Sequence, residues 1–269
     1  MKLLQVPDGF KTKVLELAGE EDVIISCESC FGACDIKVDE AKRLGCNKII
    51  HYGHSKMVDS DIEVEYREMK EDYDPTEVLN TNEIKFNKIG LVSAIQFIDS
   101  LKIAKTVLGE RAIIGGQVLG CDVSNAIKIK DQVDGFLFIG SGKFHPIGVS
   151  MQTGKPVLLL NVESGKIEEI DTSVFQKQRY VNQALFKDAQ IIGILVSTKV
   201  GQMNIKLAKE IKEKLKPRKS YILSMDEITP DKLEGIKVDA YVNTACPRIA
   251  IENRGLFRKP ILNADELWV

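Results

Sequence analysis

The sequence predicts an α/β protein built from three homologous small parallel-sheet domains arranged around a pseudo-threefold axis. Two observations support this fold class. Three stretches of the chain open alike, each with a short apolar strand followed by an amphipathic helix. The separation between Cys34 and Gly53 is also the same as that between Cys121 and Gly140. Strands that alternate with helices favour parallel sheets joined by right-handed crossovers.

The opening strands are expected at residues 3–6, 90–95 and 193–197. In the segment after each strand, apolar residues recur at steps of three and four, which places one apolar stripe against a sheet. The stripes consist of Phe10, Val14, Leu17 and Ala18, then Phe97, Leu101, Ala104 and Leu108, then Ala208, Ile211 and Leu215.

Three more strands complete each stretch. The second strands are expected at residues 22–26, 111–115 and 220–223, the third at 48–51, 135–139 and 239–242, and the fourth at 62–66, 156–161 and 260–262. We therefore predict three domains, with residues 1–83, 84–184 and 185–269.

The composition fits a soluble protein with more than one core. The chain has 269 residues, of which 44% are hydrophobic and 28% charged, and cores stop growing near ~250–300 residues. The net charge of −2 gives no general attraction to nucleic acid or to a membrane. No apolar run approaches the ~18–20 residues of a membrane span, and the N-terminus lacks the pattern of a signal peptide. We expect a cytoplasmic protein that binds neither membranes nor nucleic acid directly.

Six cysteines in such a chain are expected to stay reduced, as core thiols, nucleophiles or metal ligands. Cys27 and Cys46 are predicted to be core residues, because Cys27 continues a strand and Cys46 replaces an apolar residue at a strand start. Cys30 is ambiguous. Two and three residues separate Cys27, Cys30 and Cys34, a spacing with which these three could chelate a metal by themselves.

Cys34, Cys121 and Cys246 each follow a strand of a different predicted domain. Ligands of parallel sheets lie beyond the carboxyl ends of the strands, so a threefold arrangement could direct all three loops to one point. Small neighbours such as Gly32, Gly120 and Ala245 leave room for a bulky inorganic cluster. The repeat therefore favours a shared metal cluster on these three cysteines.

Five stretches of the chain, in order, resemble the diphthamide synthase family, in particular the archaeal 2-(3-amino-3-carboxypropyl)histidine synthases. The stretches are Cys30-Phe31-Gly32-Ala33-Cys34-Asp35, His51-Tyr52-Gly53-His54-Ser55, Gly116-Gln117-Val118-Leu119-Gly120-Cys121, Phe138-Ile139-Gly140-Ser141-Gly142-Lys143-Phe144-His145-Pro146 and Thr244-Ala245-Cys246-Pro247-Arg248-Ile249-Ala250. The resemblance covers essentially the whole chain. The sequence departs from archaeal relatives in lacking their usual N-terminal extension, which bears on dimer contacts and on docking of a protein substrate.

The resemblance implies a 4Fe–4S cluster held by Cys34, Cys121 and Cys246, with Cys30 as a bystander. It also implies that the 3-amino-3-carboxypropyl group of S-adenosylmethionine is transferred to a histidine of translation elongation factor 2, leaving methylthioadenosine. This is the first step of diphthamide biosynthesis, by radical chemistry of a noncanonical kind. An external electron donor and a homodimer are the further partners that the resemblance implies.

Six other residues are predicted to contact substrate: His54, Ser141, Gly142, Lys143, His145 and Arg248. The loop Ser141-Gly142-Lys143 could hold a carboxylate or ribose through backbone N–H groups and an ammonium, although a plain strand-to-helix turn has the same pattern. His145 could equally stabilise its turn. Arg248 could pair bidentately with a carboxylate or form a structural ion pair.

From Lys199 to Lys219 the chain carries eight basic residues and two acidic ones, Glu210 and Glu213. The apolar stripe of this segment predicts a solvated outer face, and contact with an acidic protein or an RNA-associated partner is the alternative.

Three other functions fit part of the pattern. Quinolinate synthase also holds a cluster on one cysteine from each of three domains, and Tyr241-Val242-Asn243-Thr244 is faintly similar to it. A non-catalytic, cluster-bearing partner subunit would keep the same cysteines. A cluster-free small-molecule binder would not require cysteine in these loops.

Overall fold

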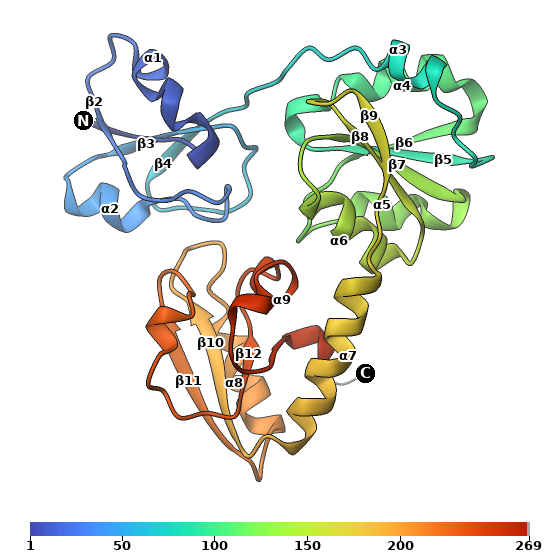
Figure 1. The fold of residues 1–269 in the computed structure, drawn as a ribbon. Helices are drawn as coiled ribbons and strands as arrows, with labels where there is room; N and C mark the ends of the chain where they lie inside the picture. The colour runs from blue at the N-terminus through green and yellow to red at the C-terminus, as the bar shows by residue number, and fades with distance from the viewer. Residues whose placement is uncertain (268–269) are drawn as a thin grey trace. The chain divides into compact units, whose positions relative to one another are not determined.

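The computed structural model describes residues 1–267, which contain three β-sheets flanked by helices (Figure 1). Internal contacts divide the chain into two compact units. Unit 1 combines Met1–Glu68 with Phe175–Val269, and unit 2 is Met69–Val174. In the described part of the chain, every helix is too short or too polar to cross a membrane.

The first sheet belongs to unit 1 and has the strand order β2-β1-β3-β4, with all pairs parallel. Its elements are β1 (Lys2–Gln5), η1 (Asp8–Lys13), α1 (Val14–Ala18), β2 (Val23–Ile25), α2 (Val38–Arg43), β3 (Lys48–Tyr52) and β4 (Glu63–Arg67). The predicted first helix forms as a 3-10 turn followed by one short α-helix. Of its apolar stripe only Ala18 is fully buried.

The second sheet lies in unit 2 and has the order β6-β5-β7-β8-β9. Its strands are β5 (Ile89–Ser93), β6 (Ala112–Gln117), β7 (Gly135–Gly140), β8 (Val157–Asn161) and β9 (Lys166–Glu169). The helical elements are α3 (Thr76–Thr81), η2 (Ile95–Phe97), α4 (Ser100–Leu108), η3 (Gly109–Arg111), α5 (Ser124–Ile129), η4 (Lys130–Gln132) and α6 (Phe144–Thr153). Every residue of β5 and β7 is buried, as expected where helices cover both faces of a parallel sheet.

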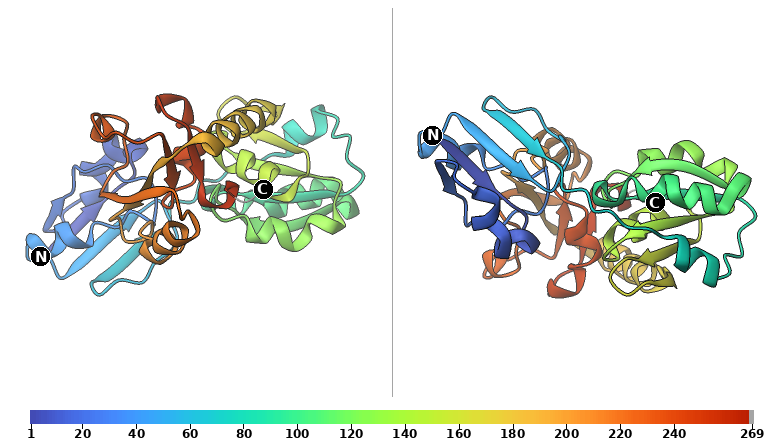
Figure 2. Two further views of the ribbon diagram at one scale, coloured as in Figure 1. Left: turned by 90° about the horizontal axis from the view of Figure 1, so that it is seen from below. Right: turned by 90° about the horizontal axis from the view of Figure 1, so that it is seen from above.

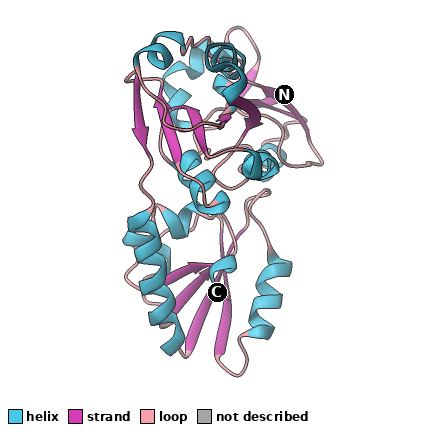
Figure 3. Ribbon diagram, turned by 90° about the vertical axis from the view of Figure 1, so that its right-hand side faces the viewer, coloured by secondary structure: helices cyan, strands magenta, loops and turns pink. Residues whose placement is uncertain are grey.

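The third sheet returns to unit 1 with the order β11-β10-β12-β13. Its elements are α7 (Ser173–Asp188), β10 (Ile191–Ser197), α8 (Ile205–Lys214), β11 (Lys219–Met225), η5 (Asp231–Leu233), β12 (Ala240–Asn243), α9 (Arg248–Ile251), η6 (Arg254–Leu256), β13 (Ile261–Asn263) and η7 (Ala264–Glu266). Residues of α7 and α8 pack against one face of this sheet, and residues of η5 and α9 pack against the other. Figure 3 shows its strands with helices beside them. The predicted stripe of Ala208, Ile211 and Leu215 is buried against the first face.

The three sheets share one topology. In each, the first four strands have the order second, first, third, fourth, and they pair in parallel. The first sheet (blue) and the third (orange to red) can be followed from two sides in Figure 2. The predicted class of three small parallel α/β repeats is thus confirmed. The domain boundaries near residues 83 and 184 stay predictions.

Two elements depart from the predicted pattern. β9 pairs antiparallel with β8 at the edge of the second sheet, where the sequence predicted only parallel strands. α7 is a 16-residue helix that the sequence did not predict. Phe186 is its single fully buried residue, and its other large apolar residues, such as Val174, Val181 and Leu185, are exposed.

Candidate metal centre

Cys34 lies in the loop between β2 and α2, and a second loop of unit 1 packs closely against it. The backbone N–H of Gly201, between β10 and α8, donates a hydrogen bond to the carbonyl oxygen of Cys34 at 2.9 Å. A Cβ atom on Gly201 would stand 2.5 Å from the Cα atom of Cys34. Only glycine therefore permits this approach, through which the third repeat covers the cysteine of the first.

The thiol of Cys34 has a side-chain hydrogen-bond donor from the same loop. Nε2 of Gln202 lies 3.4 Å from Sγ of Cys34. Burial raises the pKa of the Cys34 thiol, and the hydrogen bond from Gln202 acts in the opposite direction. A thiol becomes deprotonated when it binds a metal, so a donor aimed at the sulfur favours the form that serves as a ligand.

A buried ion pair fastens the two loops together. Nζ of Lys199 lies 2.5 Å from Oδ2 of Asp35, and both side chains are almost fully buried. Lys37 binds the other carboxylate oxygen of Asp35 at 2.9 Å, and the Lys199 ammonium lies 4.7 Å from the ring centre of Phe31. The prediction that Lys199 belongs to a solvated basic face is therefore wrong. The basic residues of α8 are exposed as predicted.

Cys246 follows β12 in a loop that is held by two asparagines. Nδ2 of Asn243 donates to the carbonyl oxygen of Cys246 and to Oδ1 of Asn263, both at 2.8 Å. Asn263 in turn donates to the carbonyl of Pro247 at 3.2 Å. Burial raises the pKa of the Cys246 thiol, and negative charge on Cys34 acts in the same direction.

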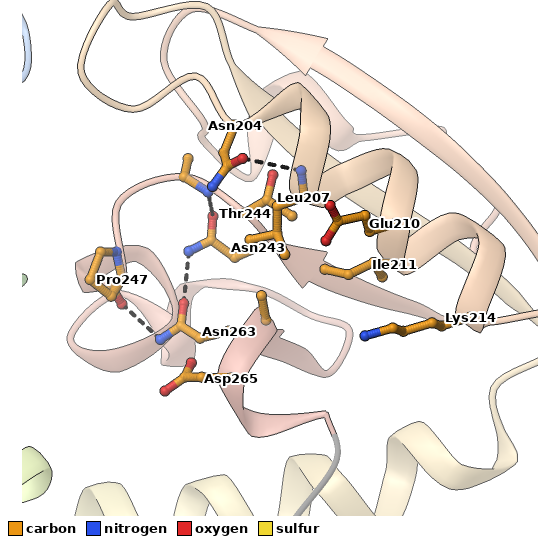
Figure 4. A pocket seen from close by; sticks show the side chains of 12 residues that line it. Asn204, Leu207, Glu210, Ile211, Lys214, Asn243, Thr244, Pro247, Asn263 and Asp265 are labelled. Carbon is orange, nitrogen blue, oxygen red and sulfur yellow. Dashed lines mark hydrogen bonds between the residues drawn. The ribbon is translucent and has the colours of Figure 1, made fainter.

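A cavity of about 460 Å³ lies beside the Cys246 loop (Figure 4). Asn243 and Asn263 line it at the carboxyl ends of their strands, opposite Asn204, whose side chain caps α8 by accepting from the N–H of Leu207 at 3.1 Å. The other lining residues are Leu207, Glu210, Ile211, Lys214, Thr244, Ala245, Pro247, Ala264 and Asp265. The cavity thus borders the same asparagine pair that holds the Cys246 loop.

Cys121 lies in unit 2, exposed in the loop between β6 and α5. The backbone N–H of Leu119 donates to the carbonyl oxygen of Asp122, and the N–H of Asp122 donates to the carbonyl oxygen of Leu119. These two hydrogen bonds close a tight turn around Cys121. The N–H of Gly120 donates to Nδ1 of His145 at 2.9 Å. A Cβ on Gly148 of α6 would stand 2.5 Å from the carbonyl oxygen of Gly120. The start of α6 thus positions the Cys121 loop.

The other predicted site residues of unit 2 surround the same helix start. Ser141 and Gly142 are exposed between β7 and α6, and Gly142 adopts a φ of +71°, which favours glycine. Nζ of Lys143 lies 2.9 Å from Oε2 of Glu168 on β9. The imidazole of His145 contacts the Cys121 loop through Gly120, and its contact with substrate stays a prediction.

His54 and Arg248 also have protein partners in unit 1. Nδ1 of His54 lies 2.9 Å from Nε2 of the buried His51, and burial lowers the pKa of both imidazoles. His51 lies in β3, as predicted. The guanidinium of Arg248 pairs with Glu252 one helical turn later, which is the structural ion pair considered as its alternative.

The remaining cysteines divide between core and surface. Cys46 is buried among apolar residues, as predicted. Cys27 is exposed, so its prediction as a core residue is wrong. Burial raises the pKa of Cys30 to about 12, which keeps it a protonated thiol. Within the described residues of unit 1, no three cysteine, histidine or acidic side chains gather closely enough to hold a metal ion. Cys27, Cys30 and Cys34 are thus not gathered into such a group there.

Comparison with known proteins decides the family. The family model described as "Putative diphthamide synthesis protein" matches residues 6–269. This chain belongs to the diphthamide synthesis family. The resemblance that the sequence motifs suggested is thereby confirmed.

Two relatives of known name and one solved structure are similar to nearly the full length of this chain. A 2-(3-amino-3-carboxypropyl)histidine synthase of Pyrococcus horikoshii is 36% identical, with 99% of this chain and 84% of the relative covered. One of Methanocaldococcus jannaschii is 29% identical, with 98% and 82% covered. The crystal structure of Dph2 from Pyrococcus horikoshii with a 4Fe–4S cluster matches with a TM-score of 0.89, 36% identity, and 99% and 84% covered.

The residues of this diphthamide family member fit a cluster chemically. Cys34 and Cys246 supply two thiols from one unit, on loops that glycine and asparagine contacts hold in place. Sulfur donors are the ligands that iron–sulfur clusters take. Sequence reasoning missed Lys199, Gly201 and Gln202, through which the loop between β10 and α8 contacts the Cys34 loop.

Proposed function

We propose that this chain is a 2-(3-amino-3-carboxypropyl)histidine synthase that holds a 4Fe–4S cluster on Cys34, Cys121 and Cys246. The observation that carries the proposal is the close contact at Gly201, through which the third repeat covers Cys34. Cys246 belongs to the same unit. Cys121 occupies the matching loop of the second repeat. The relative of known structure, with 36% identity and a 4Fe–4S cluster, supports the same assignment.

The reaction we propose is transfer of the 3-amino-3-carboxypropyl group of S-adenosylmethionine to a histidine of elongation factor 2. When bound, the cluster would supply the electron that breaks the bond between the sulfonium sulfur and the γ-carbon, leaving methylthioadenosine. The chain's own residues hold the ligands. Gln202 donates to Cys34, His145 accepts from the loop of Cys121, and Asn243 fixes the loop of Cys246.

Two of the proposed substrate contacts, Lys143 and Arg248, would leave their glutamate partners when the substrate binds. Lys143 and Arg248 each pair with an acidic side chain, Glu168 and Glu252. Both pairs are solvent-exposed, and such pairs contribute little to stability. A substrate carboxylate could therefore replace either glutamate at small cost. His54, Ser141, Gly142 and His145 complete the set of proposed contacts.

We further propose three domains with boundaries near residues 83 and 184. The protein would act as a cytoplasmic homodimer that takes electrons from an external donor. The structure records no disulfide among the six cysteines, all of which lie within residues 1–267, and a reducing compartment keeps cysteines in this state.

The test is an anaerobic reaction with dithionite, cognate elongation factor 2 and S-adenosylmethionine labelled in the aminocarboxypropyl carbons. Label should enter the factor, and methylthioadenosine should be the small product. Replacing the modified histidine of the factor should stop incorporation. Dominant 5′-deoxyadenosine would contradict the proposed bond cleavage. Methylthioadenosine without labelled factor would leave the cluster assignment intact and contradict the proposed acceptor.

A further inference from the structure

Gln202 is the residue whose side chain reaches the sulfur of a proposed cluster ligand from another repeat. Its Nε2 atom lies 3.4 Å from Sγ of Cys34, although 168 positions separate the two residues in the sequence. The side chain is partly buried. An amide N–H at this distance is a hydrogen-bond donor to sulfur, and a thiolate accepts such a bond more strongly than a thiol does because it is charged.

The backbone around Gln202 fixes where its amide points. The N–H groups of Gln202 and Met203 both donate to the carbonyl oxygen of Lys199 at 2.9 Å, which closes a turn. The N–H of Gly201 donates to the carbonyl oxygen of Cys34 at the same distance. The Lys199 ammonium is locked to Asp35, the neighbour of Cys34. Contacts at Gly201 and at Lys199, both close to Gln202 in sequence, therefore hold the Gln202 amide against Cys34. The amide needs little reorganisation when a metal binds.

We propose that Gln202 is a positioning residue that raises the reduction potential of the cluster through its hydrogen bond to the Cys34 thiolate. The inference rests on the proposed cluster. One-electron reduction adds negative charge to the cluster and its thiolates, and an N–H donor stabilises that added charge. Hydrogen bonds to the sulfurs are among the features that set the potential of iron–sulfur clusters.

The test is a reductive titration of the full chain with its cluster assembled anaerobically, followed by absorption and electron paramagnetic resonance. The variant is Gln202→Met, which keeps the length of the side chain and removes the N–H. At a fixed applied potential, the ratio of reduced to oxidised cluster should fall about tenfold, which equals ~59 mV for a one-electron couple. Gln178→Met, an exposed position on α7, is the matched control and should titrate like the wild type.

Gln202→Ala is a second variant that lacks the donor, and it covers the case in which methionine packs badly. The reduction potential should shift in the same direction in both variants. Thermal unfolding of the two variants separates a change in potential from a change in folding. An unchanged potential in both variants overturns the role of Gln202 while leaving the cluster in place. A wild-type chain that takes up no iron overturns this inference together with the proposed function.

Discussion

Asp35 is the residue through which the first repeat is joined to the third. Its carboxylate is almost fully buried and binds the ammonium groups of Lys199 and Lys37. Removing one partner of a buried ion pair leaves an uncompensated charge, which costs about 3–5 kcal/mol. Asp35→Asn should therefore lower the free energy of unfolding of unit 1 by that amount, measured by urea denaturation.

A matched control is Asp61→Asn, which removes the carboxylate of the exposed pair with Lys42. Exposed pairs contribute little, so this variant should unfold almost like the wild type. Equal stability of the two variants would mean that the Lys199–Asp35 pair does not hold the loops together.

His51 gives the stability of the chain a specific pH dependence. Burial lowers its pKa to about 3, against an ordinary value of 6.5. Between these values the unfolded chain binds a proton that the folded chain does not, so stability falls as the pH drops from 6.5 towards 3. The slope from one such group is ~1.4 kcal/mol per pH unit.

The measurement is the free energy of unfolding at several pH values between 7 and 4, for the wild type and for His51→Gln. The variant should show a shallower decline, because glutamine does not titrate. Parallel curves for the two proteins would show that His51 is not the group responsible.

The contacts of Lys199 and Gln202 with the Cys34 loop could not be predicted from the sequence. A lysine in a segment with eight basic residues is normally solvated, and the partner that buries this one, Asp35, is 164 positions away. Gln202 carries no local signal, since a polar residue between a strand and a helix is ordinary. The loops of Cys34, Cys121 and Cys246 were predictable because each cysteine follows a strand of a different repeat. Cys34 and Cys121 follow a second strand, and Cys246 follows a third strand.

At the scale of elements, α6 and the Cys121 loop depend on a close approach at Gly148. A Cβ there would meet the backbone of Gly120 at 2.5 Å, and backbone cannot move aside as a flexible side chain does. Gly148→Ala should destabilise the protein by about 1–3 kcal/mol, even though alanine favours a helix. It should also reduce the iron retained after anaerobic assembly.

Gly9→Ala is the control, because a Cβ at Gly9 has no atom within 4 Å. Its unfolding and iron content should match the wild type. If Gly148→Ala behaved in the same way, α6 would not be what holds the Cys121 loop.

The elements that the sequence predicted well are those buried on both faces. β5 and β7 are buried throughout and were placed to within two residues. β9 is short, polar and at a sheet edge, and α7 leaves Val174, Val181 and Leu185 exposed. Neither element therefore has the buried apolar pattern on which the predictions relied. Cys27 was misplaced for a related reason, since β2 ends at Ile25 and the chain leaves the core before reaching it.

At the scale of the whole molecule, three sheets of one topology carry three cysteines in loops at strand ends. Two of these cysteines belong to unit 1 and the third to unit 2. The proposed cluster would therefore take ligands from both units. The repeat predicted one ligand from each of three domains.

The measurement that tests this claim most directly is the iron and sulfide content of Cys121→Ala after anaerobic reconstitution. The wild type should bind close to four irons per chain, as a 4Fe–4S cluster requires. Cys121→Ala should lose most of them, together with the brown absorption, and Cys246→Ala should do the same. Cys27→Ala, which removes another exposed thiol, should keep them all. A full cluster in Cys121→Ala would contradict a centre built from all three repeats.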